Sequence, residues 1–366
     1  KEAAGKRRFA ELYEKRIPHM YENKRLDDLI SDLQNELDRI RIRSRVRNEI
    51  GTDIARASGK FIEEYEARKA GKSTRIWRSK FPGVNKAIGG GYYSSNMYTV
   101  YARSGRGKSV ITMEEAIEFA YQGATVLVWA LEMGWFEWMA RAFSSISARQ
   151  GLIRATIDGI DYDGGFENQS LQAGKLSEEY EAAFKTFVST LNDDMPGRII
   201  LRSTNDEDFE KRDLWALEAD IKATEADIVI VDPFYYLDYD SNTSKTAGGD
   251  AAATSKRLRI LTGRLNVVTI AVTQADEDAR EKKDGVRTLN PPQRAEVKKT
   301  KQLLEDAAAL IGIDTLAHEG RGIIEIGKGR NGGEDTQIEL IYLPNYGIVR
   351  EMPADEAEAA RFVSEF

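Results

Sequence analysis

The sequence predicts an α/β protein: a parallel sheet flanked by helices, with an antiparallel C-terminal edge, preceded by an N-terminal helical arm. Short apolar runs alternate with helix-like stretches from about residue 78, as in parallel sheets that are buried on both faces. After residue 320 two apolar runs follow each other closely and predict the antiparallel edge. Residues 1 to about 75 are rich in charged side chains and show no apolar strand, so we expect helices there.

The N-terminal arm contains LDDLISDLQNELDRI, whose apolar residues fall on one helical stripe. This stripe fits an amphipathic helix packed on its own chain, and it equally fits an arm that docks on a neighbouring subunit. The next stretch, RIRIRSRVR, has an arginine at every second position and favours neither helix nor strand. A second helix is expected in DIARASGKFIEEYEARKAGK. We therefore expect a helical region with a linker helix at residues 1–77 and a second domain at residues 78–366.

Five apolar runs are expected to form the parallel strands: MYTVYA, TVLVWALEM, RIILRS, DIVIVDPF and VVTIAVTQ. Helices between them are expected to begin near Lys108, Trp135, Leu214 and Ala251. GIIEIGKGR and TQIELIYLP are expected to be the two strands of the antiparallel edge. Residues 151–200 carry no chemical signal, and we expect them to form a helical excursion on the outside of the core.

Composition excludes several kinds of site. The chain has no Cys and only two His, so disulfides, thiolate metal sites and histidine-based centres are not expected. No run of about 18 apolar residues is present, and no signal-peptide pattern opens the chain, so we expect no membrane span and a cytoplasmic protein. The net charge of −7 argues against a surface coated for nucleic acid, although a ring or groove concentrates its basic residues locally.

The stretch VYARSGRGKS has the features of a phosphate-binding loop between a strand and a helix. Such a loop needs backbone N–H groups that point inward, a lysine that reaches the terminal phosphates and a hydroxyl for Mg²⁺ at the start of a helix. Here Lys108 is the candidate phosphate lysine and Ser109 the candidate Mg²⁺ ligand. The candidate ATP-binding loop comprises Ser104, Gly105, Arg106, Gly107, Lys108 and Ser109.

Three polar side chains lie at the ends of other predicted strands, where open α/β folds bind their ligands. Asp232 ends DIVIVD, as expected for a second Mg²⁺ ligand, and Glu132 ends LVWALE, as expected for a base that activates water. Gln274 ends IAVTQ, where an amide is able to sense the γ-phosphate. The alternatives are an aspartate that caps a strand and a glutamate that begins a helix.

Taken together, these segments resemble the motor domain of DnaB-type replicative hexameric helicases, which has a RecA-like fold. The resemblance covers residues 78–350 and rests on FPGVNKAIGGGYYSSNMYTVYARSGRGKS, VLVWALEM, IVIVDPFYYL, LNVVTIAVTQADEDAR, IEIGKGRNGG and IYLPNYGIV in the expected order. In this family Ala also replaces the first glycine of the phosphate loop, as Ala102 does here. The resemblance implies ATP and Mg²⁺ as cofactors, with Glu132 as the catalytic base and Asp232 and Ser109 as Mg²⁺ ligands.

The resemblance also implies an arginine finger. The family's Lys-x-Arg segment reaches the ATP of the adjacent subunit, so Arg330 becomes the candidate finger and Lys328 its companion. The alternative is a basic turn between two edge strands.

The resemblance further implies that two loops bind single-stranded DNA in the centre of a ring. The first is DYDSNTSKTAGGDAAATSKR, and the second spans residues 279–301, with eight Lys or Arg residues and three Asp or Glu residues. A solvated flexible loop is the alternative for each. The candidate DNA-binding residues are Lys245, Lys282, Lys283, Arg287, Arg294, Lys298 and Lys299.

The function implied is a ring-forming ATP-dependent DNA helicase, with single-stranded DNA, further copies in a hexameric ring, and a primase or helicase loader as partners, and no membrane. The alternatives are a RecA-like recombinase or filament-forming strand-binding ATPase, and a regulatory ATPase that binds protein. The N-terminal region departs from the family, because about 75 residues are too few for its usual helical domain. Either that domain has been removed, or the chain is a compact relative such as a phage encodes.

Overall fold

A nine-stranded sheet organises the larger part of the chain in this computed structural model. The structure describes residues 2–23, 29, 32–33, 36–37, 40, 52–73, 75–157, 159–239, 249–277, 287–297, 301–330 and 332–353. The chain divides into a unit at Lys1–Ser73 and a unit at Thr74–Phe366, and the sheet lies in the second. No helix among the described residues is both long and apolar enough to cross a membrane.

The sheet has the order β13-β12-β11-β10-β3-β9-β8-β4-β7. The strands from β10 to β7 are parallel, and β11, β12 and β13 continue the sheet with antiparallel pairing. The predicted fold class is therefore confirmed, including the antiparallel C-terminal edge. The strands are β3 (Met97–Ala102), β4 (Thr125–Ala130), β7 (Arg198–Ser203), β8 (Ile228–Asp232), β9 (Val268–Gln274), β10 (Ala309–Leu316), β11 (Arg321–Gly329), β12 (Thr336–Leu343) and β13 (Ile348–Glu351).

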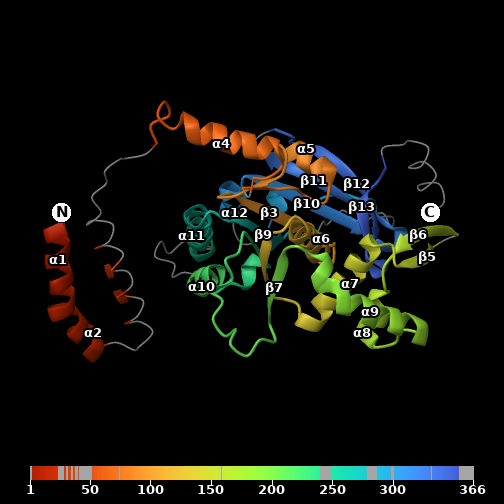
Figure 1. The fold of residues 1–366 in the computed structure, drawn as a ribbon, viewed down its shortest axis with the longest axis horizontal. Coiled ribbons are helices and arrows are strands. Elements are labelled where there is room, and N and C mark those ends of the chain that lie inside the picture. The colour runs from red at the N-terminus through yellow and green to blue at the C-terminus, as the bar shows by residue number, and fades with distance from the viewer. Residues whose placement is uncertain are drawn as a thin grey trace. The chain divides into compact units, whose positions relative to one another are not determined.

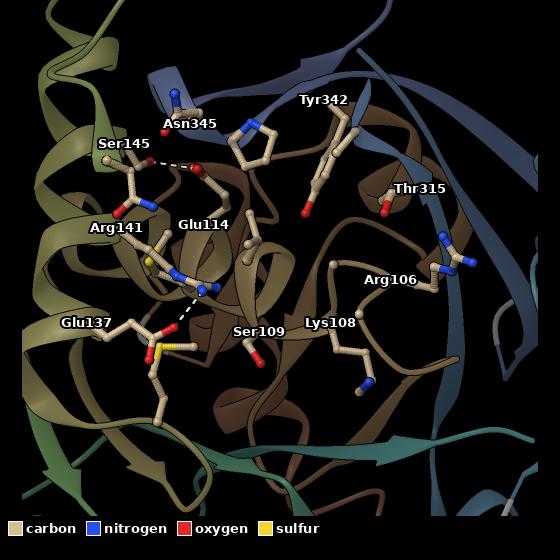
Figure 2. A pocket seen from close by; sticks show the side chains of 18 of the residues that line it. Arg106, Lys108, Ser109, Glu114, Glu137, Arg141, Ser145, Thr315, Tyr342 and Asn345 are labelled. Atoms are coloured by element: carbon tan, nitrogen blue, oxygen red, sulfur yellow. Dashed lines mark hydrogen bonds and ion pairs between the residues drawn. The ribbon is translucent and has the colours of Figure 1, made fainter. Parts of the chain in front are cut away.

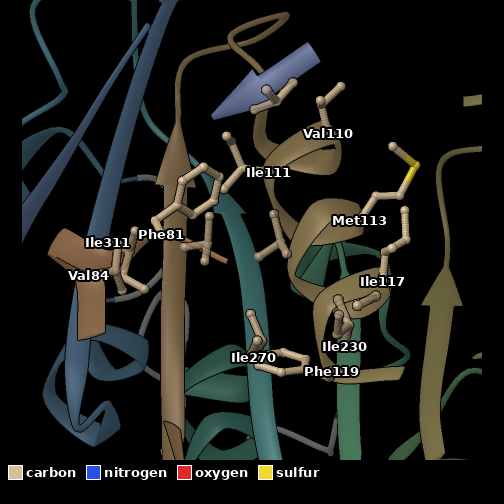
Figure 3. Close-up of a cluster of buried hydrophobic side chains, with 14 of the residues drawn as sticks. Phe81, Val84, Val110, Ile111, Met113, Ile117, Phe119, Ile230, Ile270 and Ile311 are labelled. Atoms are coloured by element: carbon tan, nitrogen blue, oxygen red, sulfur yellow. The ribbon is translucent and has the colours of Figure 1, made fainter. Parts of the chain in front are cut away.

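Helices cover both faces of the sheet, because alternate residues of each parallel strand are apolar on opposite faces. In β4, Val126 and Val128 join one buried cluster, whereas Leu127 and Trp129 join another. The first cluster includes α6 and α7, and Figure 3 shows side chains of α6 against those of the strands. The second includes α10, α11 and α12. These helices are α6 (Lys108–Tyr121), α7 (Trp135–Arg149), α10 (Leu214–Thr224), α11 (Gly249–Leu265) and α12 (Gln302–Asp306).

The helix starts predicted near Lys108, Trp135, Leu214 and Ala251 are confirmed. The start of α10 shows a local cause, because the carboxylate of Asp213 accepts hydrogen bonds from the backbone N–H groups of Trp215 and Ala216, both at 2.9 Å. The remaining elements of this unit are β1 (Ile76–Trp77), α5 (Pro82–Ile88), β2 (Tyr92–Tyr93), β5 (Ile153–Ile157), β6 (Ile160–Gly164), α8 (Asn168–Ala173), α9 (Glu178–Asp194), η2 (Phe234–Tyr236), η3 (Arg294–Glu296), η4 (Ala317–Glu319) and η5 (Pro344–Tyr346).

The segment at residues 151–200 differs from the expected helical excursion. It begins with the antiparallel hairpin β5–β6 and continues into α8 and α9, which Figure 1 shows beside α7. Phe166 and Phe187 from this segment are buried in the first cluster. Gly165 explains the close packing, because a Cβ there would lie 2.0 Å from the carbonyl oxygen of Ser144 in α7. The expectation of an external helical segment was therefore partly wrong.

The N-terminal unit is helical where the structure describes it. Helix α1 (Glu2–Glu11) continues through the π-helical turn η1 (Leu12–Arg16) into α2 (Ile17–Asn23), and α4 (Ser58–Lys69) confirms the predicted second helix. Most of LDDLISDLQNELDRI and all of RIRIRSRVR after Ile40 lie outside the described residues.

Candidate nucleotide-binding site

The predicted phosphate loop joins the end of β3 to the start of α6, at the carboxyl edge of the parallel strands. Gly105 and Gly107 adopt the left-handed backbone region, with φ of 67° and 85°, and Gly107 is the residue that precedes α6. A Cβ at Gly107 would lie 2.8 Å from the hydroxyl of Tyr342, so this position also lacks room for a side chain. The first residues of α6 line a cavity, and the free backbone N–H groups at a helix N-terminus are suited to binding phosphate.

Lys108 and Asp232 form the charged centre of the site. Lys108 is 8% exposed, and its Nζ donates to the carbonyl oxygen of Arg103 at 3.2 Å. Burial lowers the pKa of Lys108, against the opposing effect of Asp232 and Glu132. Burial also raises the pKa of Asp232 to about 6, although a hydrogen bond from Ser109 and the charge of Lys108 act the other way. The site thus keeps one buried cation and one buried carboxyl side by side.

The residues present fit a Mg²⁺ ion. Oδ1 of Asp232 is buried and has no hydrogen-bond partner, and the Ser109 hydroxyl bonds to the same carboxylate. An unpartnered buried carboxylate oxygen next to a hydroxyl suits a hard cation that takes its other ligands from phosphates and water. Ser109 and Asp232 are therefore the candidate Mg²⁺ ligands.

Tyr235 lies between Glu132 and Gln274, two of the predicted catalytic residues. Its hydroxyl donates to Oε1 of Gln274 at 3.2 Å and lies 3.5 Å from Oε2 of Glu132. Burial raises the pKa of Tyr235 above its ordinary value, with the Glu132 charge adding to the effect, so the hydroxyl stays protonated as a donor. Tyr235 was not among the site residues predicted from the sequence. Its position three residues after Asp232, at the same sheet edge, was the available signal.

The site opens into a cavity of about 480 Å³, which Figure 2 shows in close-up. Lys108 and Ser109 lie on its phosphate-loop side, and the walls come from α6, α7, α8 and the turn η5. Arg141 and Glu137 pair at 2.6 Å, and Ser145 donates to Glu114 at 2.7 Å. The described residues that line the cavity include all six of the predicted loop, together with Glu132 and Gln274.

The turn η5 is held in place by the segment at residues 151–200. The side-chain amide of Asn345 donates to Glu167 at 2.9 Å and accepts from the backbone N–H of Gln169 at 3.0 Å. The backbone N–H of Gly165 donates to the carbonyl oxygen of Tyr346 at 2.8 Å. Residues 151–200, which carry no chemical signal in the sequence, thus contribute Asn168 and Gln169 to the cavity wall and hold η5 beside them.

Lys328 and Arg330 lie near the amino ends of the parallel strands, whereas the phosphate loop lies at their carboxyl ends. Gly329 pairs with Ala309, and Ala309 pairs with Tyr98 at the beginning of β3. Arg330 accordingly donates to Asn96 at 3.2 Å. The six residues of β3 separate the two ends by roughly 20 Å. The structure therefore does not bring Arg330 together with the other predicted catalytic residues within one chain.

Lys328 has three contacts within its own chain. Its Nζ donates to the carbonyl oxygens of Leu304, Glu305 and Ala307 at 2.9–3.0 Å, where α12 ends. A lysine in this position caps the exposed carbonyls of the helix. Burial lowers the pKa of Lys328, with the nearby Arg330 and Arg294 charges adding to the effect. A role across a subunit interface stays a prediction for both residues.

Two of the seven predicted DNA-binding residues lie among the described residues. Arg287 is tied to the end of β10, because its guanidinium pairs with the buried carboxylate of Asp314 and donates to the carbonyl oxygen of Thr315 at 2.8 Å. Arg294 is half exposed and lies 3.7 Å from Glu334. DNA binding stays a prediction for the whole set. The other five, Lys245, Lys282, Lys283, Lys298 and Lys299, lie outside the described residues.

Comparisons with known proteins identify the family. Residues 78–350 match the family described as "DnaB-like helicase C terminal domain". Among solved structures, an ATPase domain is 17% identical over 83% of this chain and 100% of that chain, with a TM-score of 0.63. A DnaB-like replicative helicase, solved to show its interactions with primase, is 18% identical over 96% of this chain and 78% of that one, with a TM-score of 0.60. No curated protein matches the chain. Because the family match covers more than half of its residues, this chain belongs to the DnaB-like helicase family through its C-terminal domain.

Proposed function

We propose that this protein is an ATP-driven, ring-forming replicative helicase that moves along single-stranded DNA and unwinds the duplex. The observation that carries this proposal is that the candidate catalytic groups lie at opposite ends of the parallel strands. Glu132 and Gln274 line the cavity with the phosphate loop, and Asp232 is bonded to Ser109 of that loop, whereas Arg330 lies at the opposite ends of the strands. A finger so far from its own phosphate loop suits a site completed by the next subunit of a ring.

The phosphate loop would hold the β- and γ-phosphates of ATP through the N–H groups at the start of α6 and the ammonium group of Lys108. The buried position of Lys108 supports this role, because a phosphate would replace the single carbonyl that its Nζ now contacts. Ser109 and Asp232 would hold Mg²⁺, which neutralises phosphate charge when it is bound.

Hydrolysis would use the groups around Tyr235. Glu132 would accept a proton from the water that attacks the γ-phosphate, and Gln274 would hydrogen-bond the γ-phosphate. Arg330, with Lys328, would enter from the adjacent subunit and stabilise the charge that spreads over the γ-phosphate oxygens. Known arginine fingers accelerate this chemistry by about 10³–10⁵-fold.

The expected first loop is shorter than predicted, because residues 249–257 belong to α11. The segments at residues 238–257 and 279–301 would track the DNA backbone without reading its bases, because neither is rich in aromatic residues. Sequential hydrolysis around the ring would then move the loops along the strand. The excess of Lys and Arg at residues 279–301 implies DNA binding that weakens steeply as salt rises.

The same proposal includes the domain organisation of the chain, its assembly into a ring, its location and its partners. Residues 1–77 would form a helical region with a linker helix, and residues 78–366 the motor domain. Six copies would form the ring in the cytoplasm of a bacterium or of a phage-infected host. A primase or a helicase loader is the further partner that we propose, and one of the two similar structures concerns a helicase that interacts with primase.

The proposal is tested by ATP hydrolysis with and without single-stranded DNA and by displacement of one strand from a forked duplex. We expect DNA to stimulate hydrolysis, the forked duplex to be unwound and electron micrographs to show closed rings. Lys108→Ala should abolish both activities, whereas Lys185→Ala, on the exposed face of α9, should leave them unchanged. Unwinding by Lys108→Ala at the wild-type rate would refute the assignment, and open filaments that never displace a strand would favour a recombinase.

A further inference from the structure

The first residue after β3, Arg103, carries a guanidinium group that is buried inside the protein. Its side chain is 1% exposed and does not line the cavity. One of its terminal nitrogens donates to the carbonyl oxygen of Asn290 at 2.7 Å, and the other donates to Oε2 of Glu296 at 3.0 Å. A guanidinium loses several kcal/mol of hydration when buried, so these contacts are needed to hold it there. Arg103 therefore joins the phosphate loop to a distant segment, residues 287–297.

The backbone of Arg103 belongs to the phosphate loop itself. Its carbonyl oxygen accepts from Nζ of Lys108 at 3.2 Å and from the backbone N–H of Arg106 at 3.3 Å. A bound phosphate would draw the Lys108 ammonium group towards itself and leave this carbonyl without its charged donor. The position of Arg103 is therefore sensitive to whether the phosphate loop is occupied.

The segment at residues 287–297 is also attached to the strand that ends in Gln274. The backbone N–H of Asp276 donates to the carbonyl oxygen of Glu296 at 2.7 Å, and Ala275 forms a β-bridge with Val297. The Glu296 carboxylate, besides pairing with Arg103, accepts from the backbone N–H of Gln293 at 2.7 Å. The end of β9 is thus bonded directly to the same segment.

The third attachment is to β10. The backbone N–H of Asn290 donates to Oδ2 of Asp314 at 2.8 Å, and Asp314 is buried. The next residue, Thr315, lies against the phosphate loop, because its Cγ2 would be 3.0 Å from a Cβ at Gly107. Segment 287–297 thus rests on the phosphate loop, on the strand of the γ-phosphate sensor and on the strand beside them.

We propose that Arg103 is a positioning residue that transmits the nucleotide state of the phosphate loop to segment 287–297. The inference rests on the proposed function in one respect, since this segment is the described middle of the loop expected to contact DNA. Nucleotide binding would shift Arg103, and with it Asn290 and Glu296. By thermodynamic reciprocity, DNA that fixes this segment would change the affinity for nucleotide by the same factor.

The first test measures hydrogen exchange of residues 287–297 with and without Mg²⁺ and a slowly hydrolysed ATP analogue. We expect the wild type to change its protection in this segment when the analogue binds. Arg103→Met, which keeps an unbranched apolar side chain but removes the guanidinium group, should lose that change, and Arg103→Lys should keep part of it. The control is Arg149→Met, which removes an arginine paired with Glu118 between α6 and α7. If Arg103→Met folds poorly, Glu296→Ala removes the partly exposed partner instead and should give the same loss.

The second test measures the affinity of a fluorescent oligothymidylate in the presence of the analogue and of ADP. We expect the ratio of the two affinities to fall by about 5- to 20-fold in Arg103→Met, while analogue affinity without DNA changes by less than about twofold. The proposal is overturned if both Arg103→Met and Glu296→Ala show the same exchange response as the wild type. It is also overturned if Arg103→Met loses as much affinity for the analogue without DNA as it loses in the ratio of DNA affinities. If neither the wild type nor any variant binds the oligonucleotide, the proposed function fails, and the exchange data alone decide the role of Arg103.

Discussion

The hydroxyl of Tyr235 donates to the side-chain oxygen of Gln274 at 3.2 Å, and this contact places a tyrosine beside the predicted γ-phosphate sensor. The same hydroxyl is 3.5 Å from Glu132. The hydroxyl therefore orients the candidate γ-phosphate sensor and lies next to the candidate base. Because Tyr235 follows β8 and Gln274 ends β9, the contact also links two adjacent strands of the sheet.

We expect Tyr235→Phe to lower the kcat for ATP hydrolysis by about 10- to 100-fold and to change KM by less than about twofold, because it removes an orienting hydrogen bond and leaves the phosphate loop intact. Steady-state kinetics measure both constants. Tyr236→Phe is the matched control, since its ring is 46% exposed and it should retain wild-type kcat. A Tyr235→Phe enzyme with unchanged kcat would rule out this positioning role.

We expect Asp232→Asn to stabilise the nucleotide-free protein while it abolishes Mg²⁺-dependent hydrolysis. Burial raises the pKa of Asp232 from 3.8 to about 6, so between these values the folded chain binds more protons than the unfolded chain. The free energy of unfolding therefore falls as the pH rises from 3.8 to about 6, and the full cost of the buried charge is present above about pH 6. Removing the charge should add about 1–2 kcal/mol at about pH 7.

Thermal unfolding without nucleotide measures this effect. Each added kcal/mol should raise the Tm by about 2–4 °C. The gain should shrink as the pH falls from about 6 to 3.8 and vanish well below 3.8, where Asp232 is protonated in both states. Asp193→Asn, an exposed aspartate of α9, should shift neither the Tm nor the activity. A Tm for Asp232→Asn below that of wild type at neutral pH contradicts the prediction.

We expect Arg330→Ala and Lys108→Ala subunits to be inactive alone and to recover activity when they are mixed. In the proposed ring each interface would join the phosphate loop of one chain to Arg330 of the next. One random pairing in four would then be intact, which predicts about a quarter of wild-type activity. ATP hydrolysis after mixing measures the recovery. Mixing Lys108→Ala with a chain that carries both substitutions is the control and should give no recovery. Inactivity of assembled mixed rings would exclude a finger acting between subunits.

We expect Gly107→Ala to abolish nucleotide binding and Gly105→Ala to retain it. Both residues have positive φ, which disfavours alanine by about 1 kcal/mol. Only at Gly107 would a Cβ also meet a neighbour, at 2.8 Å from the Tyr342 hydroxyl, whereas nothing lies within 4 Å at Gly105. Titration with a fluorescent ATP analogue separates the two variants. Equal affinities would show that backbone conformation alone, and not the contact with β12, limits this position.

The sheet edge that carries the site was predictable because apolar runs mark buried parallel strands and because their carboxyl ends meet at one edge. Asp232 and Gln274 followed from that rule alone. Strand β10 was missed, since Gly312 and Asp314 interrupt its apolar pattern. Arg287 was consequently assigned only to DNA, because its buried partner Asp314 lies on that strand.

Contacts between segments that are distant in the sequence were not predictable from local pattern. Tyr235 and Arg103 are ordinary residues of their segments until folding brings Gln274 and Glu296 against them. Lys328 likewise carries no sign of the three carbonyl oxygens that its ammonium group contacts. The sequence pattern locates residues at strand ends, whereas side-chain partners across the sheet depend on its strand order.

The turn η5 closes the cavity from the late part of the chain, and this order matters while the protein is being synthesised. Ser144 contacts Asn345 across a separation of 201 residues. At about 5–20 residues per second, a ribosome needs roughly 10–40 s to add that length. During this interval the nascent chain has its phosphate loop but lacks the part of the cavity wall that Pro344 and Asn345 form, so a nucleotide bound then would have fewer contacts. Chains that stall before β12 should therefore be cleared by proteases even when nucleotide is plentiful.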